Sequence, residues 1–169
     1  MLSEFRNEPY VDFSKPENRK AQEEALSRIS RDFSNEYGLF INGREVKTGR
    51  TFKSYNPSHK DQVLAVFHKA GKDEVDLAMQ AALAAQEKWK TIDAKERALV
   101  LLKAAQILRK RKAEVNAWMI SEAGKTWIEA EADTAEAIDF LEFYGREAVR
   151  WSEIKGALPF ANEATELRY

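Results

Sequence analysis

The hydrophobic residues of this chain change their spacing near Gly71, and this change limits which elements each part can form. Between residues 39 and 70, apolar and polar side chains alternate, as in DQVLAVFHKA (61–70), which is typical of β-strands. After Gly71 the apolar residues recur every three or four positions, which is the spacing of one helix face. The sequence therefore predicts an α/β fold that is mostly helical, with about three short strands between residues 39 and 70.

Turn residues mark the ends of these strands. LFINGREV (39–46) contains Asn42-Gly43, a pair that tolerates the positive φ angles of a tight turn, so a turn or hairpin is expected there. TFKSYNPS (51–58) alternates and stops at Asn56-Pro57. Before the strands, the stretch from Pro16 to about Phe33 has the pattern of a short amphipathic helix.

Capping residues mark the predicted helices after Gly71. Asp73 is expected to cap a helix that reaches about Trp89. Asp93 and Glu96 resemble a capping box for one long helix that ends at Gly124. A last helix is predicted from about Lys125 to Trp151. The predicted organisation within residues 1–169 is an arm and helix (1–38), short strands (39–70), long helices (71–155) and a connector (156–169).

Composition limits the classes of function. A chain of 169 residues with 44% hydrophobic content can form one domain with a core. Its formal net charge of -1 provides no global field that attracts nucleic acid or anionic membranes. The N-terminus resembles neither a secretory signal nor a transit peptide, and no apolar run is long enough for a membrane span. We therefore expect a cytoplasmic protein without nucleic-acid or membrane partners.

Most of the common catalytic and ligand-binding motifs are missing from the sequence. It has no cysteine, no GxGxxG, no GxxxxGK[ST] and no HExxH. His59 and His68 lack the spacing of a helical metal site. The run RKRK (109–112) could contact phosphates or act as a localisation signal, but Glu114 follows and no aromatic residue is interleaved, so we interpret it as a solvated helix face. No catalytic, cofactor-binding or metal-binding residue is assigned.

Glu136 is the one candidate binding residue. In EADTAEAIDFLEFYGR (131–146) it shares a helical stripe with Ala132, Phe140 and Phe143, whereas nearby acids supply solvent charge. A carboxylate on an aromatic stripe needs a cationic partner. That partner is either an Arg or Lys of the protein or the ammonium group of a ligand, and the helical pattern alone does not choose between them.

Several motifs in this order resemble the aldehyde dehydrogenase superfamily. They are LFINGREV, then SYNPSHKDQVLAVFHKAGKDEVDLAMQAALAAQEKW, then the segment that contains EAGK. EADTAEAIDFLEFY and the N-terminal EPYVDFS most closely resemble its L-glutamate γ-semialdehyde (1-pyrroline-5-carboxylate) branch. The resemblance covers essentially the whole chain but only about the first third of such an enzyme.

The resemblance implies a homo-oligomeric, NAD-dependent oxidoreductase of proline degradation that oxidises glutamate γ-semialdehyde to glutamate. In that family a cysteine attacks the aldehyde, hydride passes to the nicotinamide, and a carboxylate activates water. The family's Glu in AEAIDF contacts the substrate's α-ammonium group and corresponds to Glu136. Ser54 and Glu122 lie where relatives have residues near a structural monovalent cation, but we do not assign them as metal ligands.

The chain departs from the family in what it lacks. It stops at ELRY, before the nucleotide-binding sheet and the catalytic domain, and it has no cysteine. We therefore expect this chain alone to be inactive and to bind no NAD, with the remainder of the same enzyme, or copies of itself, as its partner. The alternative is a non-catalytic helical binding or assembly module derived from that fold.

Overall fold

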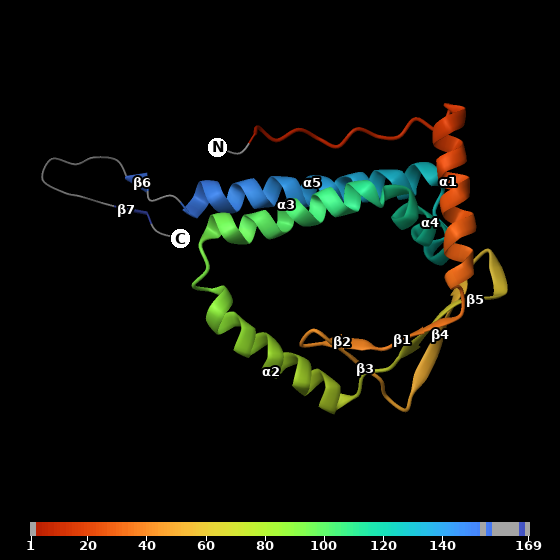
Figure 1. The fold of residues 1–169 in the computed structure, drawn as a ribbon, viewed down its shortest axis with the longest axis horizontal. Coiled ribbons are helices and arrows are strands. Elements are labelled where there is room, and N and C mark those ends of the chain that lie inside the picture. The colour runs from red at the N-terminus through yellow and green to blue at the C-terminus, as the bar shows by residue number, and fades with distance from the viewer. Residues whose placement is uncertain (1–2, 153–154, 157–165, 168–169) are drawn as a thin grey trace, which may run out of the picture. The chain divides into compact units, whose positions relative to one another are not determined.

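The computed structural model describes residues 3–152, 155–156 and 166–167. Its elements in chain order are α1 (Pro16–Ile29), the 3₁₀ turn η1 (Ser30–Asp32), β1 (Asn35–Tyr37), β2 (Leu39–Ile41), β3 (Arg44–Val46), β4 (Thr51–Asn56), β5 (His59–His68), α2 (Lys72–Trp89), α3 (Ala94–Lys110), α4 (Lys112–Ala123), α5 (Trp127–Ser152), β6 (Lys155–Gly156) and β7 (Glu166–Leu167) (Figure 1). These elements confirm the predicted α/β class, in which helices predominate.

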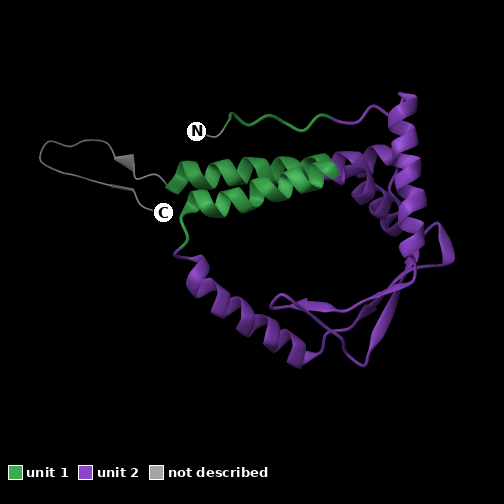
Figure 2. Ribbon diagram, in the orientation of Figure 1, with its two compact units in different colours: residues 1–9, 92–110, 135–169 green, residues 10–91, 111–134 purple. Residues whose placement is uncertain are grey.

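The chain divides into two compact units (Figure 2). Unit 1 comprises Met1–Pro9, Ile92–Lys110 and Ala135–Tyr169, and unit 2 comprises Tyr10–Thr91 and Arg111–Thr134. The predicted connector 156–169 lies outside the described residues except for Gly156 and the β7 strand. In unit 1, β6 and β7 pair in antiparallel fashion.

Unit 2 contains a small sheet and a separate hairpin. The sheet has the order β1-β5-β4, with β1 parallel and β4 antiparallel to β5. The hairpin of β2 and β3 is the one predicted from the Asn-Gly pair, with φ angles of 51° at Asn42 and 73° at Gly43. Because the hairpin contributes two strands, residues 39–70 hold four strands, not three. Sequence analysis missed β1 because it is short and fully exposed, so it carries no apolar alternation.

The core of unit 2 forms where α1 packs against α4. Ala25 and Ile29 of α1 and Ala117 of α4 are buried together, with Phe33 and Trp118 at their margin. The small side chains let the two helices approach closely. The polar residue at this contact is satisfied, because the Gln22 amide donates a hydrogen bond of 3.1 Å to the Ala113 carbonyl.

Unit 1 is built on α3 and the part of α5 after Thr134, which run side by side (Figure 1). Its buried apolar residues are Ala94, Ala98, Leu102, Ala105, Ala135 and Ile138. At Gly145 of α5, an added Cβ atom would lie 3.4 Å from Leu102 and 3.5 Å from the Ala98 carbonyl oxygen. The small residues of both helices therefore determine how closely the pair can pack.

The prediction of one long helix from Asp93 to Gly124 is wrong. The helix breaks at Arg111, where φ is -105° and ψ is 14°, and α4 begins at the next residue. The break contains neither glycine nor proline, so the usual sequence signals of a kink are absent. The start and end were predicted correctly: Asp93 accepts the Lys95 backbone N–H at 2.8 Å, and Gly124 closes α4 with a φ of 67°.

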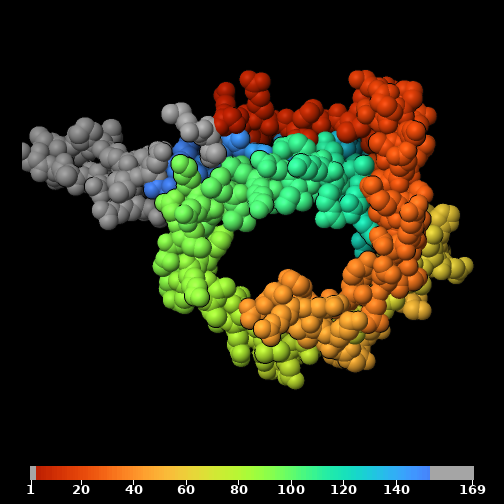
Figure 3. All heavy atoms as spheres, in the orientation of Figure 1, coloured from red at the N-terminus to blue at the C-terminus, as the bar shows by residue number. Residues whose placement is uncertain are grey.

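Helix α2 ends at Trp89 as predicted, but Asp73 is not its cap. The helix begins after Gly71, whose backbone N–H donates to the Glu74 carboxylate at 2.6 Å, so Asp73 lies inside the first turn. None of the residues of α2 is buried. Its exposed apolar side chains include Val75, Leu77, Met79, Leu83 and Trp89. In the space-filling view, α2 is uncovered on the face shown (Figure 3).

Within the described residues, no helix is both long and apolar enough to cross a bilayer. This holds for α5 as well, which is the longest helix at 26 residues.

We predict that Gly124→Ala destabilises the chain. The alanine Cβ would be held in the left-handed region and would meet the Pro57 ring at 3.2 Å, and such a conformation costs roughly 1–2 kcal/mol for a residue with a Cβ. Urea denaturation followed by circular dichroism measures this change. Gly49→Ala is the matched control, because nothing lies within 4 Å of its added Cβ, and equal effects of the two variants would contradict the prediction.

Candidate functional site

The candidate residue Glu136 lies on α5, a helix with a well-defined start. The Thr126 hydroxyl accepts the Glu129 N–H at 3.3 Å, and the Glu129 carboxylate accepts the Thr126 N–H at 2.9 Å. This reciprocal capping box satisfies backbone donors of the first turn, and it holds the pKa of Glu129 below its usual range. The predicted start at Lys125 is therefore two residues early.

The Glu136 side chain is exposed. Among the residues that the structure describes, it has no hydrogen bond or ion pair. A protein cation therefore does not neutralise Glu136 within this part of the chain. The carboxylate remains available for a ligand cation, although its binding role stays a prediction.

Aromatic rings continue the stripe that begins at Glu136. Phe140, Phe143 and Tyr144 follow at helical spacing and are 51%, 40% and 56% exposed. The rings of Phe140 and Tyr144 are 5.8 Å apart, and those of Phe143 and Tyr144 meet edge to face at 5.3 Å. The helix thus presents one exposed carboxylate beside an exposed aromatic surface. We call Glu136, Phe140, Phe143 and Tyr144 the Glu136 stripe.

The sequence suggested that nearby acids of α5 supply solvent charge, and this is wrong for Asp139 and Glu142. Asp139 accepts hydrogen bonds from the Glu8 backbone N–H at 2.6 Å and from the Asn7 side chain at 2.7 Å. Glu142 forms ion pairs with Arg109 and Arg146 and is 15% exposed. Both carboxylates therefore bind other parts of unit 1.

The interpretation of RKRK as a solvated helix face is wrong only for its last residue, Lys112, which is buried, whereas Arg109, Lys110 and Arg111 are exposed. Arg109 pairs with Glu8 at 2.7 Å, and this hydrogen bond raises the pKa of the guanidinium above its usual value. Arg111 binds both oxygens of Glu114, at 3.1 and 2.6 Å. The same contact lowers the pKa of the Glu114 carboxyl. Ion pairs thus bind Arg109 and Arg111, although both side chains stay exposed.

Lys112, the fourth residue of the run, takes part in a buried network that sequence analysis missed. Its ammonium lies 2.7 Å from Glu131, and the two side chains are only 10% and 3% exposed. Glu131 also accepts hydrogen bonds from the Asn116 amide at 2.8 Å and the Val11 N–H at 2.9 Å. Thr134 donates to Asn116 at 2.6 Å. One feature of the sequence could have revealed this network. Glu131 is spaced at helical intervals from small residues of α5 that are buried, so Glu131 lies on the packed face of the helix.

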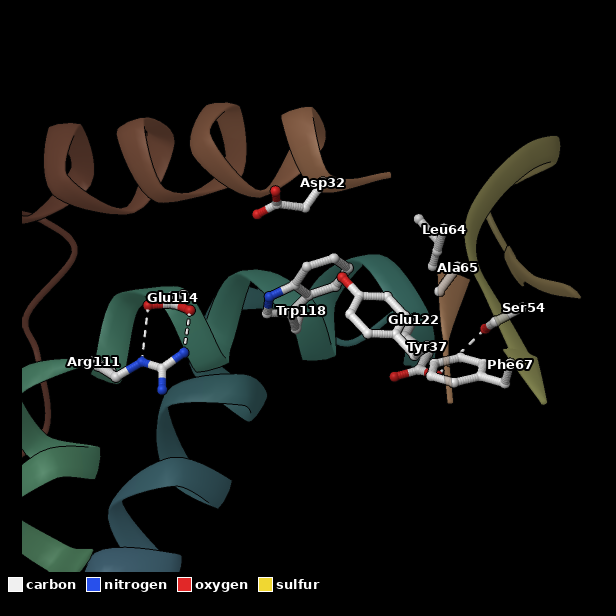
Figure 4. A pocket seen from close by; sticks show the side chains of 10 residues that line it. All are labelled: Asp32, Tyr37, Ser54, Leu64, Ala65, Phe67, Arg111, Glu114, Trp118 and Glu122. Carbon is white, nitrogen blue, oxygen red and sulfur yellow. Dashed lines mark hydrogen bonds and ion pairs between the residues drawn. The ribbon is translucent and has the colours of Figure 1, made fainter. Parts of the chain in front are cut away.

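A cavity of about 430 Å³ lies in unit 2 between α4 and the sheet (Figure 4). Its lining includes Asp32, Tyr37, Trp118, Ser54 and Glu122. The Ser54 hydroxyl donates to the Glu122 carboxylate at 3.3 Å (Figure 4). The structure thus brings together the two residues that the resemblance placed near a cation. The described residues contain no group of three or more His, Asp or Glu side chains that could hold a metal ion.

His68 is buried and is used structurally. Its Nε2 atom lies 2.9 Å from a carboxylate oxygen of Glu36, and its Nδ1 atom lies 2.8 Å from the Thr48 backbone nitrogen. The hydrogen bond from His68, with a second from Lys47, lowers the pKa of Glu36. This ring therefore links β5 to β1 and to the loop after β3. His59 is exposed at the start of β5.

This fold and sequence define the class of the protein: the chain belongs to the aldehyde dehydrogenase family, whose sequence profile matches residues 44–167. It is 44% identical over 169 residues to 1-pyrroline-5-carboxylate dehydrogenase 1 of Halalkalibacterium halodurans, covering 100% of this chain and 33% of that protein. It is 40% identical over 169 residues to the 1-pyrroline-5-carboxylate dehydrogenase of Bacillus subtilis, with 100% and 33% covered.

The chain is also similar in structure to solved members of this group. A 1-pyrroline-5-carboxylate dehydrogenase from Thermus with bound NAD matches with a TM-score of 0.89 and 42% identity, covering 94% of this chain and 31% of that chain. Proline utilization A from Bdellovibrio bacteriovorus matches with a TM-score of 0.92 and 30% identity, over 96% and 17% of the two chains. The chain spans about a third of the length of the curated relatives it matches.

We predict that Glu131→Gln strongly destabilises the chain. The substitution removes the charge of a buried carboxylate that the Lys112 ammonium contacts at 2.7 Å, and loss of one partner of a buried ion pair typically costs about 3–5 kcal/mol. Chemical denaturation measures the free energy of unfolding. The control is Glu24→Gln, which removes an exposed pair with Lys20 at 3.8 Å and should cost less than about 1 kcal/mol. Similar costs for both variants would show that the buried pair has no special role in stability.

Proposed function

We propose that this chain is the N-terminal segment of an NAD-dependent L-glutamate γ-semialdehyde (1-pyrroline-5-carboxylate) dehydrogenase of proline degradation. The observation that carries the proposal is the exposed Glu136 carboxylate, which has no partner among the described residues and lies beside exposed aromatic rings. The names of relatives that are 44% and 40% identical across all 169 residues support the same assignment. The product of the proposed reaction is glutamate.

The Glu136 stripe suits the amino-acid end of such a substrate. Glutamate γ-semialdehyde carries an α-ammonium group at one end, a short methylene chain, and an aldehyde at the other end. A carboxylate binds an ammonium group by a charge-assisted hydrogen bond, and the rings of Phe140 and Phe143 offer apolar surface to the methylene groups. In this proposal Glu136 binds and orients the substrate and takes no part in the chemical step.

The groups that act on the aldehyde are expected elsewhere in the longer enzyme. Oxidation through a thiohemiacetal needs a cysteine, and this sequence has none. The residues of this chain also do not fit NAD. Residues 69–71, which join β5 to α2, lack a glycine-rich fingerprint, and the Glu74 carboxylate accepts the Gly71 N–H at the start of α2. We therefore propose that this chain alone is inactive and binds no NAD.

The exposed apolar surface supports the proposal that this chain is part of a larger protein or assembly. Helix α2 buries none of its side chains, and in unit 1 Leu99, Val100 and Ile107 of α3 are each about half exposed. Surfaces of this kind commonly mark contacts with other protein. The proposed partner is the remainder of the enzyme or a further copy of the chain. We propose a cytoplasmic location on the basis of the sequence alone.

The second candidate function is a non-catalytic binding or assembly module derived from the same fold. The same exposed surface of α2 would then bind a separate protein. Sequencing the gene beyond the Tyr169 codon and weighing the native protein distinguish the two proposals. An in-frame continuation with a cysteine, and a mass about three times 19.4 kDa, would support the enzyme. A stop codon and a mass near that of this chain would support the module.

An activity assay tests the catalytic proposal directly. The purified 169-residue chain should produce no NADH from glutamate γ-semialdehyde and NAD. A chimera in which this chain replaces the matching segment of the Bacillus subtilis relative should produce NADH. Activity of the isolated chain would refute its proposed inactivity. A folded chimera without activity would argue against the proposed function.

We predict that Glu136→Ala in this chimera impairs use of the amino-acid aldehyde selectively. Loss of one charge-assisted contact, worth roughly 1.5–3 kcal/mol, should lower kcat/KM for glutamate γ-semialdehyde by about 10- to 150-fold. The value for propanal, which has no ammonium group, should change little. The matched control is Glu129→Ala, since Glu129 is also exposed but caps the helix. Equal losses on both substrates would assign Glu136 a structural role.

A further inference from the structure

The N-terminal arm, residues 3–9, is attached to α5 next to the Glu136 stripe, and both belong to unit 1. The Glu8 backbone N–H and the Asn7 amide donate to the two oxygens of Asp139, at 2.6 and 2.7 Å. Asp139 follows Glu136 by three residues, so it lies on the neighbouring strip of the helix surface. The arm is therefore bound about one helical turn from the candidate residue.

Ion pairs attach the arm at further points. The Glu8 side chain is only 8% exposed and lies 2.7 Å from Arg109, which also contacts Glu142 at 3.3 Å. Arg146 donates to the Ser3 carbonyl at 2.8 Å. An extended peptide that is bound at Ser3, Asn7 and Glu8 has a defined course between these points, because few backbone torsions remain free.

Phe5 lies on the arm between these attachment points and contacts the stripe itself. Its ring meets that of Phe143 edge to face, with centroids 5.4 Å apart and planes at 74°. On its other side, the ring of Phe143 meets Tyr144 at 5.3 Å and 79°. An exposed phenylalanine would otherwise move among several rotamers. The two contacts restrict the Phe143 ring, and one of them comes from a residue more than 130 positions away in the sequence.

We propose that the N-terminal arm is a positioning element of the amino-acid recognition site, in which Phe5 holds the Phe143 ring on the helix stripe that also carries Glu136. This inference rests on the proposed function of Glu136. The ligand class is an α-amino aldehyde with a short aliphatic chain, whose methylene groups would lie on the positioned ring while Glu136 binds the ammonium group. Asp139 and Arg109 act indirectly, because they hold the arm in place.

The test uses the active chimera and compares two substrates. An edge-to-face ring contact is worth about 0.5–1.5 kcal/mol, so Phe5→Leu should raise the KM for glutamate γ-semialdehyde roughly 2- to 10-fold. The rise for propanal should be smaller, and kcat should change less than KM. The control is Phe40→Leu, which alters a 78% exposed ring on β2 of unit 2. Equal rises for both substrates would overturn the proposal.

A double-mutant cycle separates positioning from general packing. If Phe5 acts through Phe143, the double variant Phe5→Leu/Phe143→Leu should lose no more selectivity than Phe143→Leu alone. Additive losses would overturn the proposal. Glu8→Gln should reproduce the Phe5→Leu effect by loosening the arm, and circular dichroism would verify that each variant is folded.

The results for Glu136→Ala keep the two proposals distinguishable. Selective loss in Glu136→Ala, with no selective change in Phe5→Leu and Glu8→Gln, would reject the arm and retain the proposed function. Equal losses on both substrates in Glu136→Ala would reject both. Selective changes in all three variants would support both proposals.

Discussion

The buried ion pair between Lys112 and Glu131 is the interaction on which the arrangement of unit 2 depends. Two charges can leave water only when their remaining hydrogen-bonding groups are satisfied. Glu131 meets this requirement by accepting bonds from Lys112, from Asn116 and from the Val11 backbone. Within unit 2, the pair therefore connects α4, the first turns of α5 and the segment at Val11. Lys112 is also the first residue of α4, directly after the break at Arg111.

Four acids of α5, Glu131, Glu136, Asp139 and Glu142, differ in their surroundings. Glu131 is buried in unit 2, and in unit 1 Asp139 and Glu142 bind the arm and two arginines. Glu136 alone among these four is exposed and has no partner among the described residues. A carboxylate that contributes no internal contact can bind a ligand ammonium without breaking a native interaction. The helix thus combines structural acids with one that is free to act in recognition.

The apolar residues of α3 and α2 differ in how far they are buried within this chain. Ala98, Leu102 and Ala105 of α3 are buried against their own unit, whereas Leu99 and Ile107 of the same helix are about half exposed. The apolar residues of α3 are therefore only partly buried within this chain. Together with the bare α2, these residues agree with a chain that spans about a third of the length of its curated relatives.

Local sequence determined the change from strands to helices near Gly71, the Asn42-Gly43 turn and the left-handed end of α4 at Gly124, because each depends on the torsional preferences of neighbouring residues. The absence of cysteine likewise excludes a cysteine nucleophile from this chain. Tertiary structure alone decided which acid is buried, that Asp139 and Glu142 are bound, and that Phe5 meets Phe143. The contacts of Phe5, Glu8 and Val11 with α5 join residues 120 or more positions apart, and local periodicity contains no information about such pairs.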